Sequence, residues 1–210
     1  MSEKPYKIDI SEKRLERFEK ISSLRQTDLT VVLENVHDPH NIGAILRSCD
    51  SIGIDEVYII DTDPRLQGRS LQNKGSSTGI NKWIKINYFT NIDECIHEVK
   101  SRFSYLVGTV IGNDSKSLYH LDYSKSTAFV FGNEKDGITD DLAKHLDQNM
   151  LIPQVGFAQS LNVSVACAVT LYEAMRQRLK TNNYEKKSQP EVLQRFINAD
   201  QTKRLNKINN

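Results

Sequence analysis

Short apolar runs and helical patterns alternate along most of this 210-residue chain. Residues 30–34 and 57–60 are mainly apolar and have the length expected of buried strands. Between them, apolar residues recur at helical spacing over residues 41–52. Further strands are predicted near 84–88, 105–111, 128–132 and 150–152, and further helices over 91–101, 139–146 and 160–180. Such alternation predicts an α/β fold in which helices flank a mostly parallel sheet.

The two ends of the chain depart from this pattern. Residues 11–24 predict a charged, amphipathic helix whose short apolar face, formed by Ile21 and Leu24, needs a packing partner. Residues 191–199 predict a short terminal helix. We therefore expect a helical N-terminal extension over residues 1–28, a central domain over 29–180 and a basic C-terminal extension over 181–210.

The near-neutral net charge of +1 hides an uneven distribution. Residues 64–85 contain five basic residues and no acid, and residues 176–210 contain nine basic residues against three acids. Basic segments on an otherwise acidic protein suggest a polyanion as partner. Charge alone slightly favours the simpler interpretation, in which these residues are only solvated surface.

The cysteines and the hydropathy limit the cellular setting. Cys49, Cys95 and Cys167 are scattered and lie in apolar contexts, which argues for a reducing compartment and against a cysteine-based zinc site. No apolar run approaches membrane-spanning length, and the N-terminus lacks the features of a signal peptide. We therefore expect a cytoplasmic protein with no membrane partner and no bound metal.

The strongest sign of chemistry lies in residues 152–166. Ser160, Asn162 and Ser164 cluster where a predicted strand end meets an apolar helix, and Pro153 and Gly156 precede them. One such side chain would suffice to cap the helix, which is the simplest interpretation of the segment. A shaped loop at a strand end is also where α/β proteins hold ligands.

Two other segments place polar side chains beside predicted strand ends. Asn41 is expected to cap the helix over residues 41–52, and Arg47 points away from the apolar stripe of that helix. Arg47 is either an ordinary surface residue or a bidentate phosphate ligand. Gly132 and Gly137 bracket a charged turn that contains Glu134. The standard nucleotide-binding glycine motifs and the common nucleophilic triads are not recognisable in the sequence.

Residues 34–47, 132–138 and 152–166 together resemble the three sequence blocks of the SpoU branch of the SPOUT methyltransferases. Within that branch, the chain is most similar to the tRNA guanosine 2′-O-methyltransferases that act on the D-loop. The resemblance implies a homodimer, a C-terminal trefoil knot and S-adenosyl-L-methionine as methyl donor. It also implies tRNA as partner and the D-loop guanosine at position eighteen as the methylated nucleotide.

Site residues are implied by the same resemblance, position by position. The catalytic set that it implies is Asn41, Arg47, Glu134, Ser160 and Asn162. The donor would contact Thr109, Gly132, Ile152 and Leu161. His40, Arg176 and Arg178 match positions tied to RNA binding or catalysis.

We also expect an RNA-binding surface that includes Arg14, Arg17, Arg25, Lys74 and Lys82. One alternative function is methylation of a ribosomal RNA ribose by an enzyme of the same family. A second alternative is a non-catalytic RNA-binding protein on this fold. The presence of all five catalytic candidates argues against the second alternative.

Overall fold

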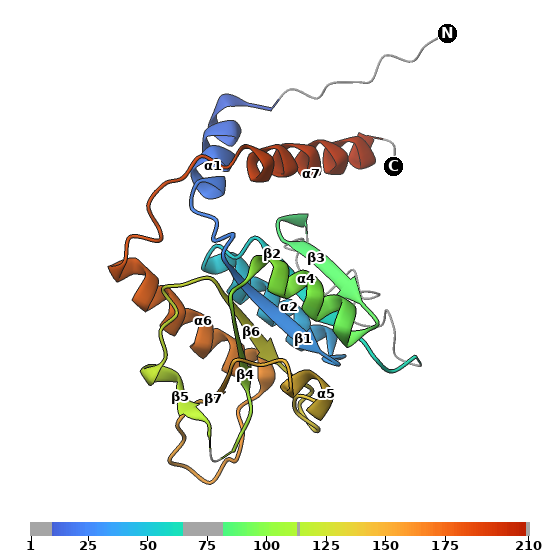
Figure 1. The fold of residues 1–210 in the computed structure, drawn as a ribbon. Coiled ribbons are helices and arrows are strands. Elements are labelled where there is room, and N and C mark those ends of the chain that lie inside the picture. The colour runs from blue at the N-terminus through green and yellow to red at the C-terminus, as the bar shows by residue number, and fades with distance from the viewer. Residues whose placement is uncertain (1–9, 65–81, 113, 209–210) are drawn as a thin grey trace. The chain divides into compact units, whose positions relative to one another are not determined.

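The computed structural model describes residues 10–64, 82–112 and 114–208 (Figure 1). The chain divides into two compact units. The larger unit, residues 26–184, contains the whole sheet. The smaller unit combines the N-terminal residues up to Arg25 with the residues from Glu185 onward. The N- and C-terminal extensions, which were predicted as separate segments, therefore share one unit.

A seven-stranded sheet forms the centre of the larger unit. Its strands are β1 (Leu29–Glu34), β2 (Glu56–Ile60), β3 (Lys85–Phe89), β4 (Tyr105–Thr109), β5 (Lys116–Ser117), β6 (Thr127–Phe131) and β7 (Gln148–Leu151). The strand order is β3-β2-β1-β6-β4-β7-β5, and every neighbouring pair is parallel. This confirms the predicted sheet. Because all pairs are parallel, the carboxyl ends of the strands lie at one edge.

Helices cover both faces of the sheet (Figure 1). They are α2 (Pro39–Ser51), α4 (Ile92–Arg102), α5 (Asp140–Ala143) and α6 (Val163–Lys180), with a short 3₁₀ helix, η2, at Leu118–His120. Val31 and Leu33 of β1 pack in one apolar cluster with α2 and α6. Val32, between them, belongs to a second cluster with α4 and α5. The period-two alternation of β1 thus assigns each helix pair to its own face.

The smaller unit is a pair of helices, α1 (Glu12–Ser22) and α7 (Pro190–Ile208). The rings of Phe18 and Phe196 meet edge to face, with 6.2 Å between their centroids. The α7 helix is therefore the packing partner that the N-terminal helix was expected to need, and it is longer than predicted. The predicted apolar face was wrong in detail, because Phe18 is buried and Ile21 is 38% exposed.

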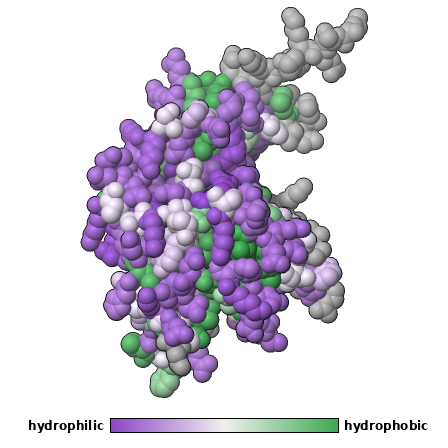
Figure 2. Space-filling model, viewed as in Figure 1, coloured by the Kyte–Doolittle hydropathy of each residue, from purple (hydrophilic) through white to green (hydrophobic). Residues whose placement is uncertain are grey.

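Hydrophilic side chains cover most of the visible surface, with smaller apolar patches between them (Figure 2). Within the described ranges, no helix is both long and apolar enough to cross a membrane. The trefoil knot stays a prediction.

Arg178 is an interior residue of the larger unit, so the prediction that it binds RNA was wrong. Its side chain is fully buried near the end of α6. The guanidinium donates hydrogen bonds to the Asp28 carboxylate, to Gln26 Oε1 at 3.1 Å and to the carbonyl oxygens of Tyr123 and Lys125, each at 3.2 Å. It therefore ties the end of α6 to the segment before β1 and to the segment before β6.

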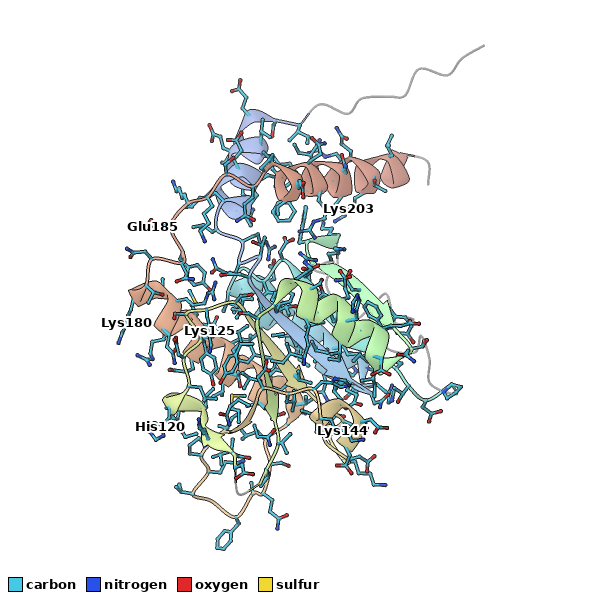
Figure 3. All side chains as sticks on the ribbon, in the orientation of Figure 1. His120, Lys125, Lys144, Lys180, Glu185 and Lys203 are labelled. Carbon is cyan, nitrogen blue, oxygen red and sulfur yellow. The ribbon has the colours of Figure 1, made fainter. Side chains whose placement is uncertain are left out.

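Replacing Arg178 with Met should destabilise the fold by about 3 kcal/mol, since it leaves buried acceptors without a donor and Asp28 without its counter-ion. Chemical denaturation followed by circular dichroism would measure the loss. Lys180→Met is a matched control, because Lys180 projects into solvent two residues further along (Figure 3). That control should change stability by less than about 0.5 kcal/mol. An equally small effect of Arg178→Met would contradict the assignment.

Candidate functional site

A chain of side-chain hydrogen bonds joins the three sequence blocks at the carboxyl edge of the sheet. Asn41, in the first turn of α2, donates to Glu134 Oε1 at 2.5 Å. The amide of Asn162 donates to Asn41 Oδ1 at 3.1 Å. Asn41 therefore meets one residue 93 positions and another 121 positions further along the chain. We call Asn41, Glu134 and Asn162 the amide–carboxylate network. Three of the five predicted catalytic residues belong to it.

Asn162 has two roles in this arrangement. It is the N-cap of α6, and its Oδ1 accepts from the backbone N–H of Ser164 at 2.9 Å and from the Ser164 hydroxyl at 2.6 Å. Its Nδ2 remains directed at Asn41. The capping interpretation of this segment is thus confirmed, and the same side chain also contacts Asn41, while a role of the segment in a ligand site stays a prediction. Because capping restricts the Asn162 side chain, α6 orients the network.

Asn41 does not cap its own helix, contrary to prediction. Asp38 is the N-cap of α2, where its carboxylate accepts from the His40 N–H at 2.9 Å, and Pro39 occupies the first helical position. Asn41 therefore lies inside the first turn. Its side-chain amide donates to Glu134 and accepts from Asn162. The sequence signal was present, since Asp followed by Pro is a typical helix start.

Glycine shapes the loop that carries Glu134. Asn133 and Gly137 exchange two backbone hydrogen bonds of 3.0 and 2.9 Å, which close the loop after β6. Gly137 has a φ of 71°, a conformation that favours glycine. A Cβ on Gly132 would lie 2.1 Å from the carbonyl of Gly137, so no larger residue fits there without moving the loop. Glu134 is exposed at the turn of this loop.

A buried carboxylate, for which no role was predicted, supports the loop that carries Glu134. Glu34 ends β1 with no exposed surface, and its two oxygens accept from the Thr139 hydroxyl at 2.5 Å and the Thr139 N–H at 2.8 Å. Burial raises the pKa of Glu34, although the hydrogen bonds from Thr139 oppose that shift. Glu34 thereby fixes the start of α5 beneath the loop. An acidic residue at the end of an otherwise apolar strand was the available signal.

A cavity of about 470 Å³ opens beside the network. It lies at the carboxyl ends of β4, β6 and β7 and against the segment that leads into α6. The four residues expected to contact the donor all line it: Thr109, Gly132, Ile152 and Leu161. Glu134 and Ser160 of the expected catalytic set line it too. The structure therefore brings the predicted donor positions and two catalytic candidates into one cavity.

Arg47 lies apart from that cavity. It is exposed on α2, two helical turns beyond the first turn that holds Asn41, and it is not among the described residues that line the cavity. The structure therefore places Arg47 on the outer surface of a helix that starts at the network. The other four catalytic candidates are at the network or in the cavity.

The expected RNA-binding residues have varied environments. Arg25 is only 3% exposed, and its guanidinium lies 5.2 Å from the centroid of the Phe196 ring, so its predicted place on an RNA surface was wrong. Arg14 is half-exposed and pairs with Asp200. Arg176 is exposed and forms a bidentate pair with Glu173, with two contacts of 2.7 Å.

Of the remaining candidates, Arg17 and His40 are exposed, and the Lys82 ammonium lies 4.4 Å from the centroid of the Trp83 ring. Lys74 lies outside the described residues. The structure leaves the RNA-binding role of these residues a prediction.

The comparisons with known proteins agree with this geometry. Residues 28–172 match the model of the SpoU rRNA Methylase family. The chain is 38% identical over 188 residues to the tRNA (guanosine(18)-2′-O)-methyltransferase of Thermus thermophilus, an alignment that covers 89% of this chain and 95% of the relative.

Two solved structures extend the comparison. The A. aeolicus TrmH/SpoU tRNA modifying enzyme superposes with a TM-score of 0.80 at 36% identity, covering 90% of this chain and 97% of that one. The SpoU methyltransferase AviRb from Streptomyces viridochromogenes, in complex with the cofactor AdoMet, gives a TM-score of 0.62 at 29% identity over 74% of this chain and 59% of that one.

Proposed function

The chain belongs to the SpoU methylase family, and from this membership we propose that it methylates a ribose 2′-hydroxyl in tRNA, at the D-loop guanosine at position eighteen. The observation that carries the proposal is the network of Glu134, Asn41 and Asn162 beside the cavity at the strand ends. It unites the three blocks of the family in one place. Similarity to a tRNA-modifying relative over nearly the full length of both chains supports tRNA as the substrate.

The cavity suits S-adenosyl-L-methionine. Its volume of about 470 Å³ falls within the usual range for small-molecule sites, roughly 300–1,000 Å³. Apolar side chains such as Ile152 and Leu161 line it together with the polar strand-end residue Thr109. This combination fits a ligand with an aromatic base and a charged amino-acid end. When bound, the donor supplies an electrophilic methyl group on a sulfonium, and we propose that the knotted part of the chain encloses it.

The network would orient the ribose. Asn41 uses both polar groups of its amide in the hydrogen-bonded chain and Asn162 uses its Nδ2, which restricts the rotation of both side chains. Glu134 anchors that chain and also lines the cavity, as does Ser160. Residues fixed in this way can hold the 2′-hydroxyl in line with the methyl group, and positioning of this kind can supply much of a rate enhancement.

Arg47 would act on the phosphate backbone of the substrate. Arginine binds phosphate through two parallel N–H donors, and an exposed position on α2 is accessible to RNA. The alternative role, removal of the proton from the 2′-hydroxyl, is physically demanding because a guanidinium is not deprotonated in proteins. We therefore assign Arg47 to phosphate binding and to orientation of the ribose.

The wider RNA surface would use the remaining basic candidates: Arg14, Arg17, His40, Lys74, Lys82 and Arg176. Contacts of this type are mainly to phosphates, so tRNA affinity should fall steeply with salt. All three cysteines are free and buried, which supports the cytoplasmic setting that we propose.

A homodimer is supported by α6. Val165, Tyr172 and Leu179 are 47%, 54% and 55% exposed, and they recur every seven residues. Seven residues are close to two helical turns, so the three side chains form one apolar stripe. Val155 and Phe157, in the loop that precedes α6, are also exposed apolar residues. A second copy of the chain would cover this stripe.

Ribosomal RNA remains the alternative substrate, because the matching family model is named for rRNA methylases. Incubation with labelled S-adenosyl-L-methionine and unmodified tRNA should place label in the tRNA, at the ribose of the D-loop guanosine. A matched tRNA with a 2′-deoxyribose at that nucleotide should take up none. Label in ribosomal RNA but not in tRNA would support the alternative, and label in neither would contradict a catalytic role.

Gly132→Ala tests the cavity as the donor site. The added Cβ would collide with the Gly137 carbonyl, so the loop must move into or away from the cavity. We expect the affinity for S-adenosyl-homocysteine, measured by calorimetry, to fall by at least about tenfold, equivalent to roughly 1.4 kcal/mol. Gly112→Ala is the control, since a Cβ there meets only Ser115 Oγ at an ordinary 3.8 Å. Unchanged affinity in Gly132→Ala would place the donor elsewhere.

A further inference from the structure

A second polar cluster lies at the same edge of the sheet, beyond the amide–carboxylate network. Asp61 follows β2 and is fully buried. The Tyr88 hydroxyl, from β3, donates to Asp61 Oδ2 at 3.0 Å. His37 Nδ1 lies 3.6 Å from the other carboxylate oxygen, Oδ1. The roles assigned so far use none of these three residues.

The His37 ring faces the Asp61 carboxylate with Nδ1 at 3.6 Å, a separation that is longer than a hydrogen bond and makes this an electrostatic contact. Its Nδ1 is buried, yet 21% of the side chain is exposed, so the exposed part belongs to the rest of the ring. A carboxylate that faces Nδ1 favours the tautomer with the proton on that nitrogen. Nε2 is then left as the polar atom available to an external group. Burying a carboxylate carries a cost, and the hydrogen bond from the Tyr88 hydroxyl offsets part of that cost.

The backbone that carries His37 is fixed at both ends to the site. On one side, Asn35 adopts a left-handed φ of 54°, its Oδ1 accepts from the Thr62 N–H at 2.9 Å, and its carbonyl accepts from Asn133 Nδ2 at 2.8 Å. Asn133 directly precedes Glu134. On the other side, Asp38 caps the helix that carries Asn41. His37 is therefore held on the segment that links two members of the network.

We propose that His37 contacts the substrate, with Nε2 hydrogen-bonded to the RNA backbone beside the methylated ribose. Asp61 and Tyr88 act as positioning residues that set the ring. The inference rests on the proposed function, because it takes RNA as the ligand. It adds a contact from the β2 side of the site, whereas the donor cavity lies at β4, β6 and β7.

Two isosteric substitutions distinguish substrate contact from packing. The Asn amide reaches about as far as Nδ1, whereas the longer Gln amide reaches about as far as Nε2. A contact made through Nε2 predicts that His37→Gln retains kcat/KM for tRNA within about threefold of the wild-type value. His37→Asn should lose about tenfold, mainly through KM, which corresponds to one hydrogen bond of about 1.4 kcal/mol. A purely structural role toward Asp61 predicts the reverse order.

Tyr88→Phe provides a second test that leaves His37 in place. Losing the hydroxyl loosens Asp61, so KM for tRNA should rise, by less than in His37→Asn. The control is His97→Asn on the exposed face of α4, which should leave KM unchanged. S-adenosyl-homocysteine affinity and melting temperature, measured on every variant, show whether the donor cavity and the fold are intact.

The inference is overturned if kcat/KM for tRNA is as high in His37→Asn as in His37→Gln, or higher. It is also overturned if both variants have the wild-type kcat/KM, or if both lose activity together with a large drop in melting temperature. Failure of the proposed function would differ from each of these results, because the wild-type protein would then not methylate tRNA.

Discussion

Parallel pairing of β1 with β6 is the constraint on which the site depends. The register sets Leu33 of β1 beside Phe131 of β6, so both strands end at the same level of the same edge. The loop after β6 then carries Glu134 to the start of α2, where Asn41 meets it. A parallel sheet must return each strand through a crossover, and here the segments that leave the strand ends bring the polar residues together. Any change of register would separate Glu134 from Asn41.

Rigidity around the network comes from hydrogen bonds that lie outside it. Glu34 holds Thr139 beneath the loop, Asn133 holds the backbone of Asn35, and Asn162 caps α6 while it bonds to Asn41. Each of these contacts restrains the network itself or a segment next to it. Sites built in this way depend on supporting contacts as much as on the groups that face the ligand. Such support has a desolvation cost at Glu34, because burial disfavours the charged carboxylate and raises its pKa.

Much of the fold could be read from periodicity. In the described part of the central domain, each predicted strand and helix exists, because buried strands and amphipathic helices have distinct periods; the helix that the first part of residues 64–85 could form lies outside the described residues. The two-residue strand β5 was not predicted, since so short an element carries no periodic signal. The position of α7 against α1 depends on a contact between rings 178 residues apart, which no local pattern encodes.

The site was predictable in its blocks but not in every residue. Arg176 and Arg178 look alike in sequence, yet only Arg178 is buried, because Asp28 and the carbonyl groups near residue 124 accept its hydrogen bonds. His37 and Asp61 are brought together by the pairing of β1 with β2, so their relation was also hidden. The resemblance to a family supplied the donor, which neither charge nor periodicity could indicate.

The central claim is that Asn41 and Glu134 act as one unit, and a double-mutant cycle tests it most directly. Asn41→Ala, Glu134→Gln and the double variant would be compared by kcat/KM for tRNA methylation, with donor affinity measured in parallel. When two residues work together, the effects of their substitutions on kcat/KM are non-additive. Each single change should therefore lower kcat/KM at least about tenfold, and the double variant should be little less active than the less active single variant. Losses that simply multiply would show that the two residues act independently and would contradict the account.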